Sequence, residues 1–310
     1  LGEESLAVEL ASNDGYLLQY YRAAGVQVLG IDPAEAQVEA ARAKGVESIC
    51  DFFSDELAQQ LVDEGRQADV IHGNNVLAHV PDLRGVVEGI ALLLKPTGEA
   101  VLEFPYVKDL IDNVEFDTIY HQHLCYFSLA ALLPVFGRAG LLIVDVERIP
   151  IHGGSLRITA APSGPVSAAV GELLEQERAE GVDTLDYYLG FSANVQDLRI
   201  RLRTLVCELK DSGKSIAAYG AAAKGAILTN FTKIGRETLD WCADRNNHKH
   251  GRFMPGVRVE VVPTERVLAD QPDYLLILPW NFKDEIMAQQ QEFARRGGKF
   301  IVPVPRPEVV

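Results

Sequence analysis

Two stretches of the chain alternate short apolar runs with helical segments, and this alternation constrains the fold more than any other feature. In the first stretch, the expected helices fall at 15–24, 33–44 and 83–94, and the expected strands at 6–10, 26–31, from 69, 99–103, 141–148 and 156–160. Strands that alternate with helices in this way predict βαβ units around a parallel sheet. The expected fold class is therefore α/β, of the Rossmann-like kind.

The second stretch follows a long helical region. Apolar residues recur at spacings of three and four from Val195 to Leu209, which predicts one face of a long helix within 166–210. A second βαβ pattern then runs through 215–219, 238–243, 274–278 and 299–302. A chain of 310 residues suits two domains of about 150 residues each. We expect a first domain at 1–150, a strand and helical connection at 151–210, and a second, smaller Rossmann-like domain at 211–310.

The charge balance argues against one large class of partner. The chain has 44 acidic and 29 basic residues, so its net charge is −15. Nucleic-acid binding needs a positive surface, and we therefore expect no nucleic-acid partner. A local basic pocket for one small phosphorylated ligand stays compatible with this charge.

Cysteine and hydropathy patterns predict a cytoplasmic protein with no membrane segment. The four cysteines form neither a CxxC metal site nor a disulfide cluster, and we interpret them as reduced thiols (Cys50, Cys125, Cys207 and Cys242). No apolar run approaches the roughly 18 residues of a membrane span, and no signal peptide is visible. For the oligomeric state, the sequence leaves monomer and dimer open.

The junction between the first expected strand and helix is typical of a nucleotide site. A turn of small residues there lets a ligand approach the backbone, and the helix offers unpaired N–H groups. Asp32 ends the second strand, where a carboxylate can accept both ribose hydroxyls of an adenosine. Asp51 and Phe52 follow the next strand, and an acid beside aromatic rings suits an adenine.

The cofactor that this junction suits is S-adenosylmethionine (SAM). The G-x-G-x-x-G motif of dinucleotide sites is absent, which counts against a dehydrogenase. Glu9 would repel a pyrophosphate, whereas it suits the cationic sulfonium and amino group of SAM. The alternative is a plain strand–turn–helix corner without a ligand. The expected cofactor contacts are Glu9, Ala11, Asn13, Gly15, Asp32, Asp51, Phe52 and Asn74.

Several motifs resemble one enzyme family along nearly the whole chain. They are Glu9-Leu-Ala-Ser-Asn-Asp-Gly15, Gly73-Asn-Asn-Val-Leu-Ala-His79-Val, Phe116-Asp-Thr-Ile-Tyr120-His-Gln-His123-Leu-Cys-Tyr-Phe-Ser128, His152-Gly-Gly-Ser-Leu-Arg157 and Tyr219-Gly-Ala-Ala-Ala-Lys224-Gly. The chain resembles the class I SAM-dependent methyltransferases, and within them the deoxysugar C-methyltransferases, which act on nucleotide-linked 4-keto sugars in antibiotic biosynthesis. The resemblance implies SAM as cofactor, S-adenosylhomocysteine as product, and a C-terminal domain that holds the nucleotide.

Carbon methylation next to a ketone needs a base for the α-proton and a group that steadies the enolate. A neutral imidazole suits the first task, and a Tyr hydroxyl or a protonated His suits the second. By resemblance, His123 is the base, and Tyr120, His79 and residue 122 support the proton transfer or the substrate oxygens. The family commonly has a glutamate where this chain has Gln122, so a catalytically impaired binding protein is one alternative.

The remaining expectations concern metal and substrate. His121 and His123 stand two residues apart, but no H-E-x-x-H or Cys pair completes a zinc site, so we expect no metal. Relatives carry a small Cys-rich zinc domain ahead of the SAM domain; either the chain was cut or this member lacks it. The small-residue loop before Lys224 suits a diphosphate, although a plain α/β corner fits equally well. The expected substrate contacts are Tyr126, Tyr219, Lys224, Asn246, Lys249 and Arg252.

Two methyltransferase functions compete with each other and with a non-catalytic nucleotide-binding or assembly protein, for which Gln122 would mark the lost chemistry. The first is C-methylation of a ketone-bearing deoxysugar linked to a nucleoside diphosphate. The second is methylation of a carbon or an oxygen on a different natural-product scaffold by an enzyme of the same fold.

Overall fold

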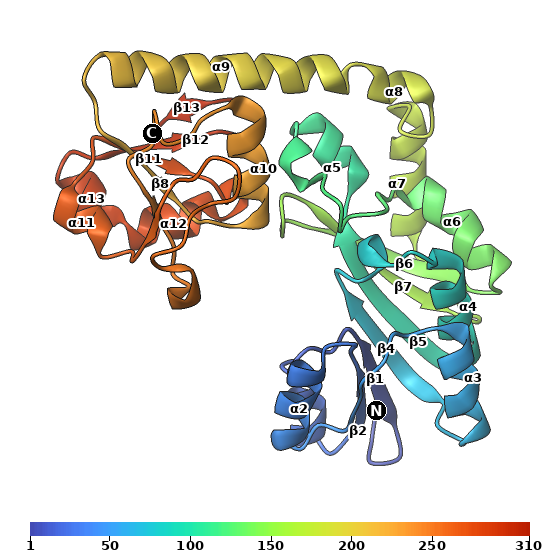
Figure 1. Ribbon diagram of the computed structural model, residues 1–310. Helices are drawn as coiled ribbons and strands as arrows, with labels where there is room; N and C mark the ends of the chain where they lie inside the picture. The colour runs from blue at the N-terminus through green and yellow to red at the C-terminus, as the bar shows by residue number, and fades with distance from the viewer. The chain divides into compact units, whose positions relative to one another are not determined.

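The computed structural model describes residues 1–310, which form two compact units (Figure 1). Unit 1 contains Leu1–Lys108 and His121–Tyr187, and unit 2 contains Asp109–Tyr120 and Tyr188–Val310. Two short helices, α5 (Val107–Asp112) and α8 (Leu185–Leu189), each contain a residue pair at which the chain passes from unit 1 to unit 2. The division into domains at residues 150 and 210 stays a prediction.

Unit 1 is built on a seven-stranded sheet in the order β3-β2-β1-β4-β5-β7-β6. Its strands are β1 (Leu6–Leu10), β2 (Gln27–Ile31), β3 (Ser48–Ile49), β4 (Ala68–Asn74), β5 (Leu94–Pro105), β6 (Leu142–Ile149) and β7 (Ser155–Ala161). The first five strands are parallel and have the 3-2-1-4-5 order of a doubly wound fold, whereas β7 runs antiparallel to β5 and β6. The expected Rossmann-like α/β fold is confirmed.

Side-chain alternation along β1 explains how the helices of unit 1 divide over the two faces of the sheet. Val8 and Leu10 belong to the core shared with α3, α4 and α6, whereas Ala7 belongs to the core shared with α1 and α2. Figure 1 shows α2 on one side of the sheet and α3 and α4 on the other. The helices of unit 1 are α1 (Leu18–Ala23), α2 (Glu35–Ala43), α3 (Asp55–Asp63), α4 (Leu83–Leu93), α6 (Leu129–Arg138) and α7 (Ala168–Ala179).

Unit 2 has a smaller sheet in the order β10-β9-β8-β11-β12-β13. The strands are β8 (Ile216–Tyr219), β9 (Cys242–Ala243), β10 (Val261–Val262), β11 (Tyr274–Ile277), β12 (Lys299–Val302) and β13 (Glu308–Val309), of which only β13 is antiparallel. The helices of unit 2 are α9 (Phe191–Asp211), α10 (Ala223–Thr232), α11 (Arg266–Asp270), α12 (Lys283–Gln289) and α13 (Gln291–Arg295).

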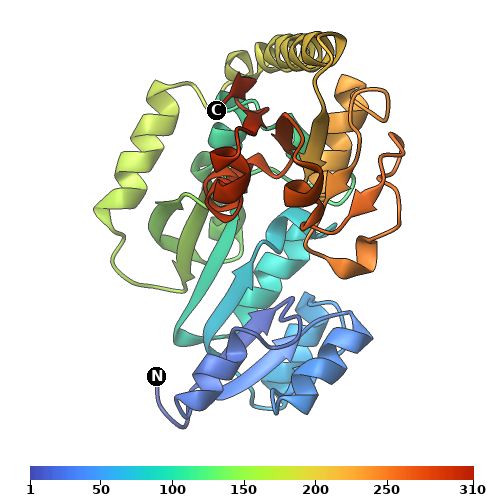
Figure 2. The same ribbon diagram turned by 90° about the vertical axis from the view of Figure 1, so that its left-hand side faces the viewer.

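The long helix α9 confirms the predicted apolar periodicity. Val195, Leu198, Leu202 and Val206 are buried in one core with strand residues such as Ile216. Figures 1 and 2 show α9 as one unbroken helix, lengthwise in the first view and nearly end-on in the second. None of the helices is long and apolar enough to cross a membrane.

Two expected boundaries in unit 2 are corrected by the structure. The strand expected at 238–243 is limited to Cys242–Ala243, because the main-chain N–H and the hydroxyl of Thr238 both bond to the carbonyl of Gly235 and close a turn instead. The small-residue loop expected before Lys224 ends at residue 222, since α10 begins at Ala223.

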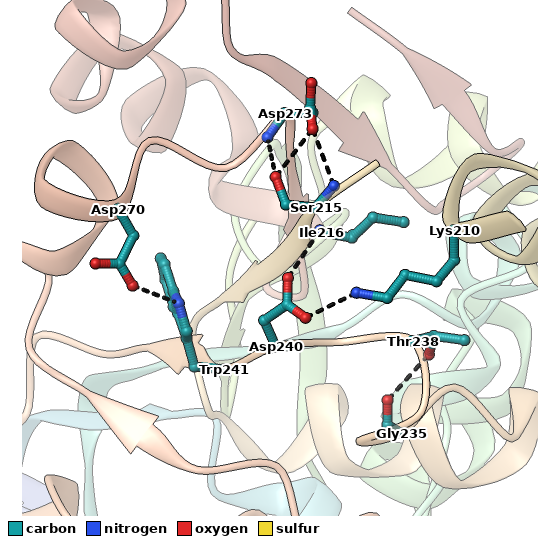
Figure 3. Close-up of polar contacts among 9 residues, drawn as sticks. All are labelled: Lys210, Ser215, Ile216, Gly235, Thr238, Asp240, Trp241, Asp270 and Asp273. Atoms are coloured by element: carbon teal, nitrogen blue, oxygen red, sulfur yellow. Dashed lines mark hydrogen bonds and ion pairs between the residues drawn. The ribbon is translucent and has the colours of Figure 1, made fainter. Parts of the chain in front are cut away.

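Carboxylates bind the amino-terminal ends of the unit 2 strands (Figure 3). Asp273, just before β11, accepts hydrogen bonds from the main-chain N–H and the hydroxyl of Ser215, both at 2.9 Å. Asp240 accepts from the N–H of Ile216 at 3.2 Å and from Lys210 at 2.7 Å. Hydrogen bonding, first of all from the Ser215 N–H, lowers the pKa of Asp273 to about 2. These acids therefore stabilise the strand ends.

Candidate functional site

The turn between β1 and α1 has an unusual backbone. Ala11, Asn13 and Gly15 all have positive φ angles, of 52°, 52° and 75°. The Asp32 carboxylate holds this turn, because its Oδ2 accepts the N–H of Asn13 at 2.9 Å while Oδ1 accepts the N–H of Ala34, also at 2.9 Å. Each carboxylate oxygen has a second lone pair, so Asp32 keeps the capacity to accept a ribose hydroxyl.

Glu9 lies beside this turn as a buried carboxyl group. Only 1% of the residue is exposed, and its Oε2 has no hydrogen-bond partner. Burial, together with the neighbouring Asp32 charge, raises the pKa of Glu9 to about 8. A buried acid with an unused oxygen fits a cationic ligand, whose positive charge would restore the ionised form. The site thus matches the cationic cofactor inferred from the sequence.

A glycine allows the turn to approach the sheet. Gly30 of β2 lies opposite Glu9 in the strand register. A Cβ atom at position 30 would lie 2.4 Å from the Oγ of Ser12, so no larger residue fits without moving the turn. Ser12 is fully buried and its hydroxyl has no partner, which marks it as a residue of this site that the sequence pattern did not single out.

The other expected cofactor contacts lie at the same carboxyl edge of the sheet. Asn74 ends β4, and its side chain lowers the pKa of the hydroxyl of Tyr16, a second residue that sequence reasoning missed. Burial first, and then the charge of Glu9, raises the pKa of that Tyr16 hydroxyl. Asp51 and Phe52 follow β3, the neighbour of β2, and both are exposed; 73% of Phe52 is accessible.

The structure brings His79 and His123 together in unit 1. The main-chain N–H groups of Leu124 and Cys125 both bond to the carbonyl of Ala78, which fixes the loop against the 3₁₀ helix Leu77–His79. The two imidazole rings lie edge to face with their centroids 4.8 Å apart. Two residues from distant parts of the chain therefore form one imidazole pair.

The main chain of Gln122 orients this pair. The Nδ1 of His79 lies 2.8 Å from the carbonyl oxygen of Gln122. A carbonyl can only accept, so Nδ1 carries the hydrogen and Nε2 is left as the nitrogen that can take a proton. The contact uses the backbone at position 122, and the Gln122 side chain is exposed.

The two tyrosines of this motif fall in different units. Tyr126 belongs to unit 1, and its ring lies edge to face with that of His123 at 6.4 Å. Tyr120 is the last residue of the unit 2 segment 109–120. Burial raises the pKa of Tyr120, so its hydroxyl stays protonated at neutral pH and can donate a hydrogen bond.

Unit 2 has a pocket of about 340 Å³ where β8 ends. Of the expected substrate contacts it includes Tyr219, and it adds residues that sequence reasoning missed, among them Arg245, Phe282 and Gln289. The Asp244 carboxylate on its wall accepts the N–H groups of Ala221 and Asn246, each at 2.8 Å, and lies 3.1 Å from the ammonium of Lys249.

The remaining expected substrate contacts are dispersed over unit 2. The side chain of Asn246 accepts the N–H of His248 and begins the 3₁₀ helix Asn247–Lys249, and Arg252 is exposed. Lys224 lies half-buried, with its ammonium 4.6 Å from the centre of the Trp280 ring and 3.2 Å from the Oδ1 of Asn281. No three His, Cys, Asp or Glu side chains gather where they could hold a metal ion.

Comparison with known proteins gives two family matches, one to each half of the chain. The family described as "Methyltransferase domain" matches residues 5–146, and the family described as "C-methyltransferase C-terminal domain" matches residues 150–305. The chain is 37% identical to the C-methyltransferase NovU of Streptomyces niveus over 313 aligned positions, which cover 100% of this chain and 74% of the relative.

Other similarities cover less of the chain. The ubiquinone biosynthesis O-methyltransferase of Bordetella pertussis is 34% identical over 29% of this chain and 39% of its own length. Among solved structures, a complex of the Haloferax volcanii Trm112 methyltransferase activator with a putative methyltransferase matches at a TM-score of 0.43 and 19% identity. This match covers 53% of this chain and 85% of that chain.

Proposed function

The chain belongs to the SAM-dependent C-methyltransferase family, and from this premise we propose that it deprotonates a carbon next to a ketone of a nucleoside-diphosphate-linked deoxysugar and methylates that carbon. The observation that carries the proposal is the imidazole pair of His79 and His123. One ring of the pair, His79, is oriented by a backbone carbonyl, and the pair offers the general base that removal of a proton from carbon needs.

For the cofactor, we assign Glu9, Asp32, Asn74 and the turn 11–15. The bound SAM supplies a methyl group on a positively charged sulfur, which makes that methyl electrophilic. Glu9 balances the positive charge with an oxygen that has no other partner, and Asp32 accepts from the ribose while it holds the turn. Asp51 and Phe52, exposed at the same sheet edge, are assigned to the adenine.

For the proton, His123 is the base. It takes the α-proton from the carbon next to the ketone, and the electron pair of that C–H bond passes into an enolate. His79 lies against it, with its Nδ1 hydrogen donated to the carbonyl of Gln122. As the resemblance implies, Tyr120 is assigned to support the proton transfer or the substrate oxygens; its hydroxyl, whose pKa burial raises further, is a hydrogen-bond donor at neutral pH. The enolate carbon then forms the bond to the methyl group while the methyl–sulfur bond breaks, its electron pair stays on the sulfur, and S-adenosylhomocysteine leaves.

The glutamine at position 122 is compatible with this chemistry. The contact that orients His79 comes from the backbone of residue 122, which any side chain leaves in place. The alternative of a catalytically impaired binding protein therefore gains no support from this position.

For the substrate, we assign the nucleotide to the pocket of unit 2. A volume of about 340 Å³ lies within the roughly 300–1,000 Å³ usual for small-molecule sites. Tyr219 and Phe282 offer flat surfaces for a base, and Arg245 offers a positive charge. Asn246, Lys249, Arg252 and Tyr126 stay proposed contacts to the phosphates and the sugar, whereas Lys224 contacts Trp280 and Asn281 of its own unit.

A product analysis tests this function. The chain is incubated with SAM and a nucleoside-diphosphate-linked 4-keto deoxysugar, and the sugar is analysed by mass spectrometry. We expect a gain of one methylene by the parent and a strongly reduced gain by His123→Ala. Transfer to a substrate that has no ketone, at the same rate in both proteins, would contradict the proposal. It would favour methylation of a different natural-product scaffold.

A further inference from the structure

The short segment 113–118 carries two acids into the interior of unit 2. Asp117 is fully buried, and its Oδ2 accepts the indole N–H of Trp280 at 2.8 Å. Glu115 is 3% exposed and accepts from the side-chain amide of Asn113 at 3.2 Å. The carbonyl of Glu115 also accepts the hydroxyl of Thr118 at 2.8 Å. The segment is therefore a hydrogen-bonded turn with its carboxylates turned inward.

Apolar contacts hold the same segment. Val114 and Phe116 are buried members of the unit 2 core. The rings of Phe116 and Phe231 lie 4.9 Å apart, which joins the segment to α10. By contact, the segment thus belongs to unit 2, although in sequence it lies inside the first half of the chain.

Lys224 supplies the charge that opposes these acids. Its ammonium lies over the ring of Trp280, the residue that binds Asp117. Asp117 and Glu115 are the charges that favour the ionised form of Lys224, although burial lowers its pKa. Burial likewise raises the pKa of Asp117 to about 6 and that of Glu115 to about 7. The second oxygen of Asp117, Oδ1, has no partner.

The place of this cluster in the sheet is unusual. Lys224 is the second residue of α10, which follows β8, and Trp280 lies just after β11. The strands β8 and β11 are neighbours, and the strand order reverses between them. In doubly wound sheets this reversal opens a crevice that usually takes a ligand. Here residues of the chain's own segment 113–118 contact the residues that follow both strands.

Such an arrangement is a poor way to gain stability alone. Burying carboxylates and an ammonium requires their desolvation, and well-packed apolar residues of similar volume often stabilise a core as well or better. A set of directed contacts instead fixes one geometry. The residues that this geometry would position follow closely in the chain. Tyr120 lies three positions after Asp117, and only residues 118–122 separate Asp117 from His123.

We propose that Asp117, Trp280 and Lys224 are positioning residues for the proton transfer: they fix the segment 113–120, and with it Tyr120 and the point at which the chain continues toward His123. This inference rests on the proposed function for its kinetic consequence. Its structural content, that the indole–carboxylate contact immobilises the segment, is independent of the substrate.

The chain offers a matched control for the test. It has two tryptophans, and each donates its indole N–H to an aspartate of unit 2: Trp280 to Asp117 at 2.8 Å, and Trp241 to Asp270 at 3.0 Å (Figure 3). Trp280→Phe and Trp241→Phe therefore remove the same kind of contact at two places. If the contact serves folding alone, the two variants should behave alike.

The experiment measures kcat, KM for the keto sugar, the SAM dissociation constant and hydrogen–deuterium exchange of peptides covering 113–123. For Trp280→Phe we expect a fall in kcat on the order of 10- to 100-fold, as for a reacting group displaced by a fraction of an ångström. Exchange in 113–120 should rise, while SAM binding stays within about twofold. Trp241→Phe should leave both kcat and this exchange unchanged.

A conservative pair of variants completes the test. Asp117→Asn keeps an acceptor for Trp280 and should retain most of the kcat, whereas Asp117→Leu should lose it as Trp280→Phe does. Equal losses of kcat in the two Trp variants, or unchanged exchange of 113–120 in Trp280→Phe, would overturn the inference. If the parent does not methylate the keto sugar, the proposed function fails, and the exchange data alone decide the immobilising role.

Discussion

Two corners of the molecule share one construction. In unit 1, Asp32 follows β2 and accepts the N–H of Asn13 in the turn after β1. In unit 2, Asp244 follows β9 and accepts the N–H of Ala221 in the turn after β8. Each aspartate also accepts the N–H two residues further along the chain. The fold therefore fixes the aspartate and the turn in the same relation in both units.

The charges around the two aspartates differ. In unit 1, Glu9 lies opposite Gly30 on the neighbouring strand, and its acid remains buried without a cation. At the corresponding place in unit 2, Ala218 lies opposite Cys242, and Lys249 binds the aspartate instead. One corner thus suits a cationic ligand, and in the other the acid is already neutralised. The ligand charge that each site suits therefore depends on the strand residue, Glu9 or Ala218, and on the ammonium of Lys249. It does not depend on the fold, which the two sites share.

The largest expected effect tests whether the chemistry belongs to unit 1. His123→Ala should lower kcat by about 10²–10⁴-fold, the usual contribution of a positioned general base, and should leave SAM affinity nearly unchanged. Steady-state kinetics and calorimetry measure the two quantities. If His123→Ala keeps most of its activity while His79→Ala loses it, the roles of the two imidazoles must be exchanged.

The second-largest expected effect concerns Glu9, the buried acid that has no counterpart in unit 2. The pKa of Glu9 is raised to about 8 in the ligand-free chain, whereas the bound cation favours the ionised form. SAM affinity should therefore increase with pH up to about pH 8, by at most about tenfold per pH unit. Calorimetric titrations between pH 6 and 9 check this slope. The same slope in Glu9→Gln would show that another group titrates.

Substituting the two aspartates in turn compares the corners directly. Asp32→Ala should weaken SAM binding by about 1–3 kcal/mol, because hydrogen bonds to a charged group are lost and the turn is released. Asp244→Ala should leave SAM affinity unchanged and raise KM for the nucleotide sugar. Calorimetry on both folded variants decides, and an equal loss of SAM affinity in the two would refute the division of ligands between the units.

The smallest effect separates the two edges of the unit 2 sheet. Asp273 lies at the opposite edge from Asp244, and its pKa is lowered to about 2. A lowered folded-state pKa adds stability above the unfolded value near pH 4, and this contribution is lost as the pH falls toward 2. Because the side chain is 39% exposed, we expect Asp273→Asn to cost only about 1 kcal/mol at neutral pH. Denaturant unfolding at pH 7 and pH 3 measures it, and altered substrate KM would contradict a purely structural role.

Helices and strands with a clear hydrophobic period could be predicted from the sequence. The strands Leu6–Leu10 and Lys299–Val302 were expected at those bounds, and the helical periodicity from Val195 to Leu209 lies within α9. The helix Asp55–Asp63 was not anticipated, although Ser54 caps it by accepting the N–H of Leu57 and so offered a signal. A helix cap of this kind can be recognised in the sequence, but only when each Ser, Thr, Asp and Asn is considered as a possible first residue of a helix.

Contacts between distant residues were beyond sequence reasoning. Asp117 and Trp280 are 163 residues apart, and no local pattern assigns the segment around Asp117 to unit 2. Lys224 was expected at a diphosphate because it follows a small-residue loop, whereas its neighbours Trp280 and Asn281 come from a different βα connection. The role of the Gln122 backbone was also hidden, since sequence comparison draws attention to the side chain that changes.

The central claim is that the imidazole pair in unit 1 prepares a carbon to receive the methyl group. The most direct test uses SAM labelled with ¹³C in its methyl group and a nucleoside-diphosphate-linked 4-keto deoxysugar, with the product examined by NMR. We expect a labelled methyl carbon bonded to the sugar carbon next to the ketone, formed by the parent and nearly absent with His123→Ala. A labelled methyl bonded to oxygen would contradict it.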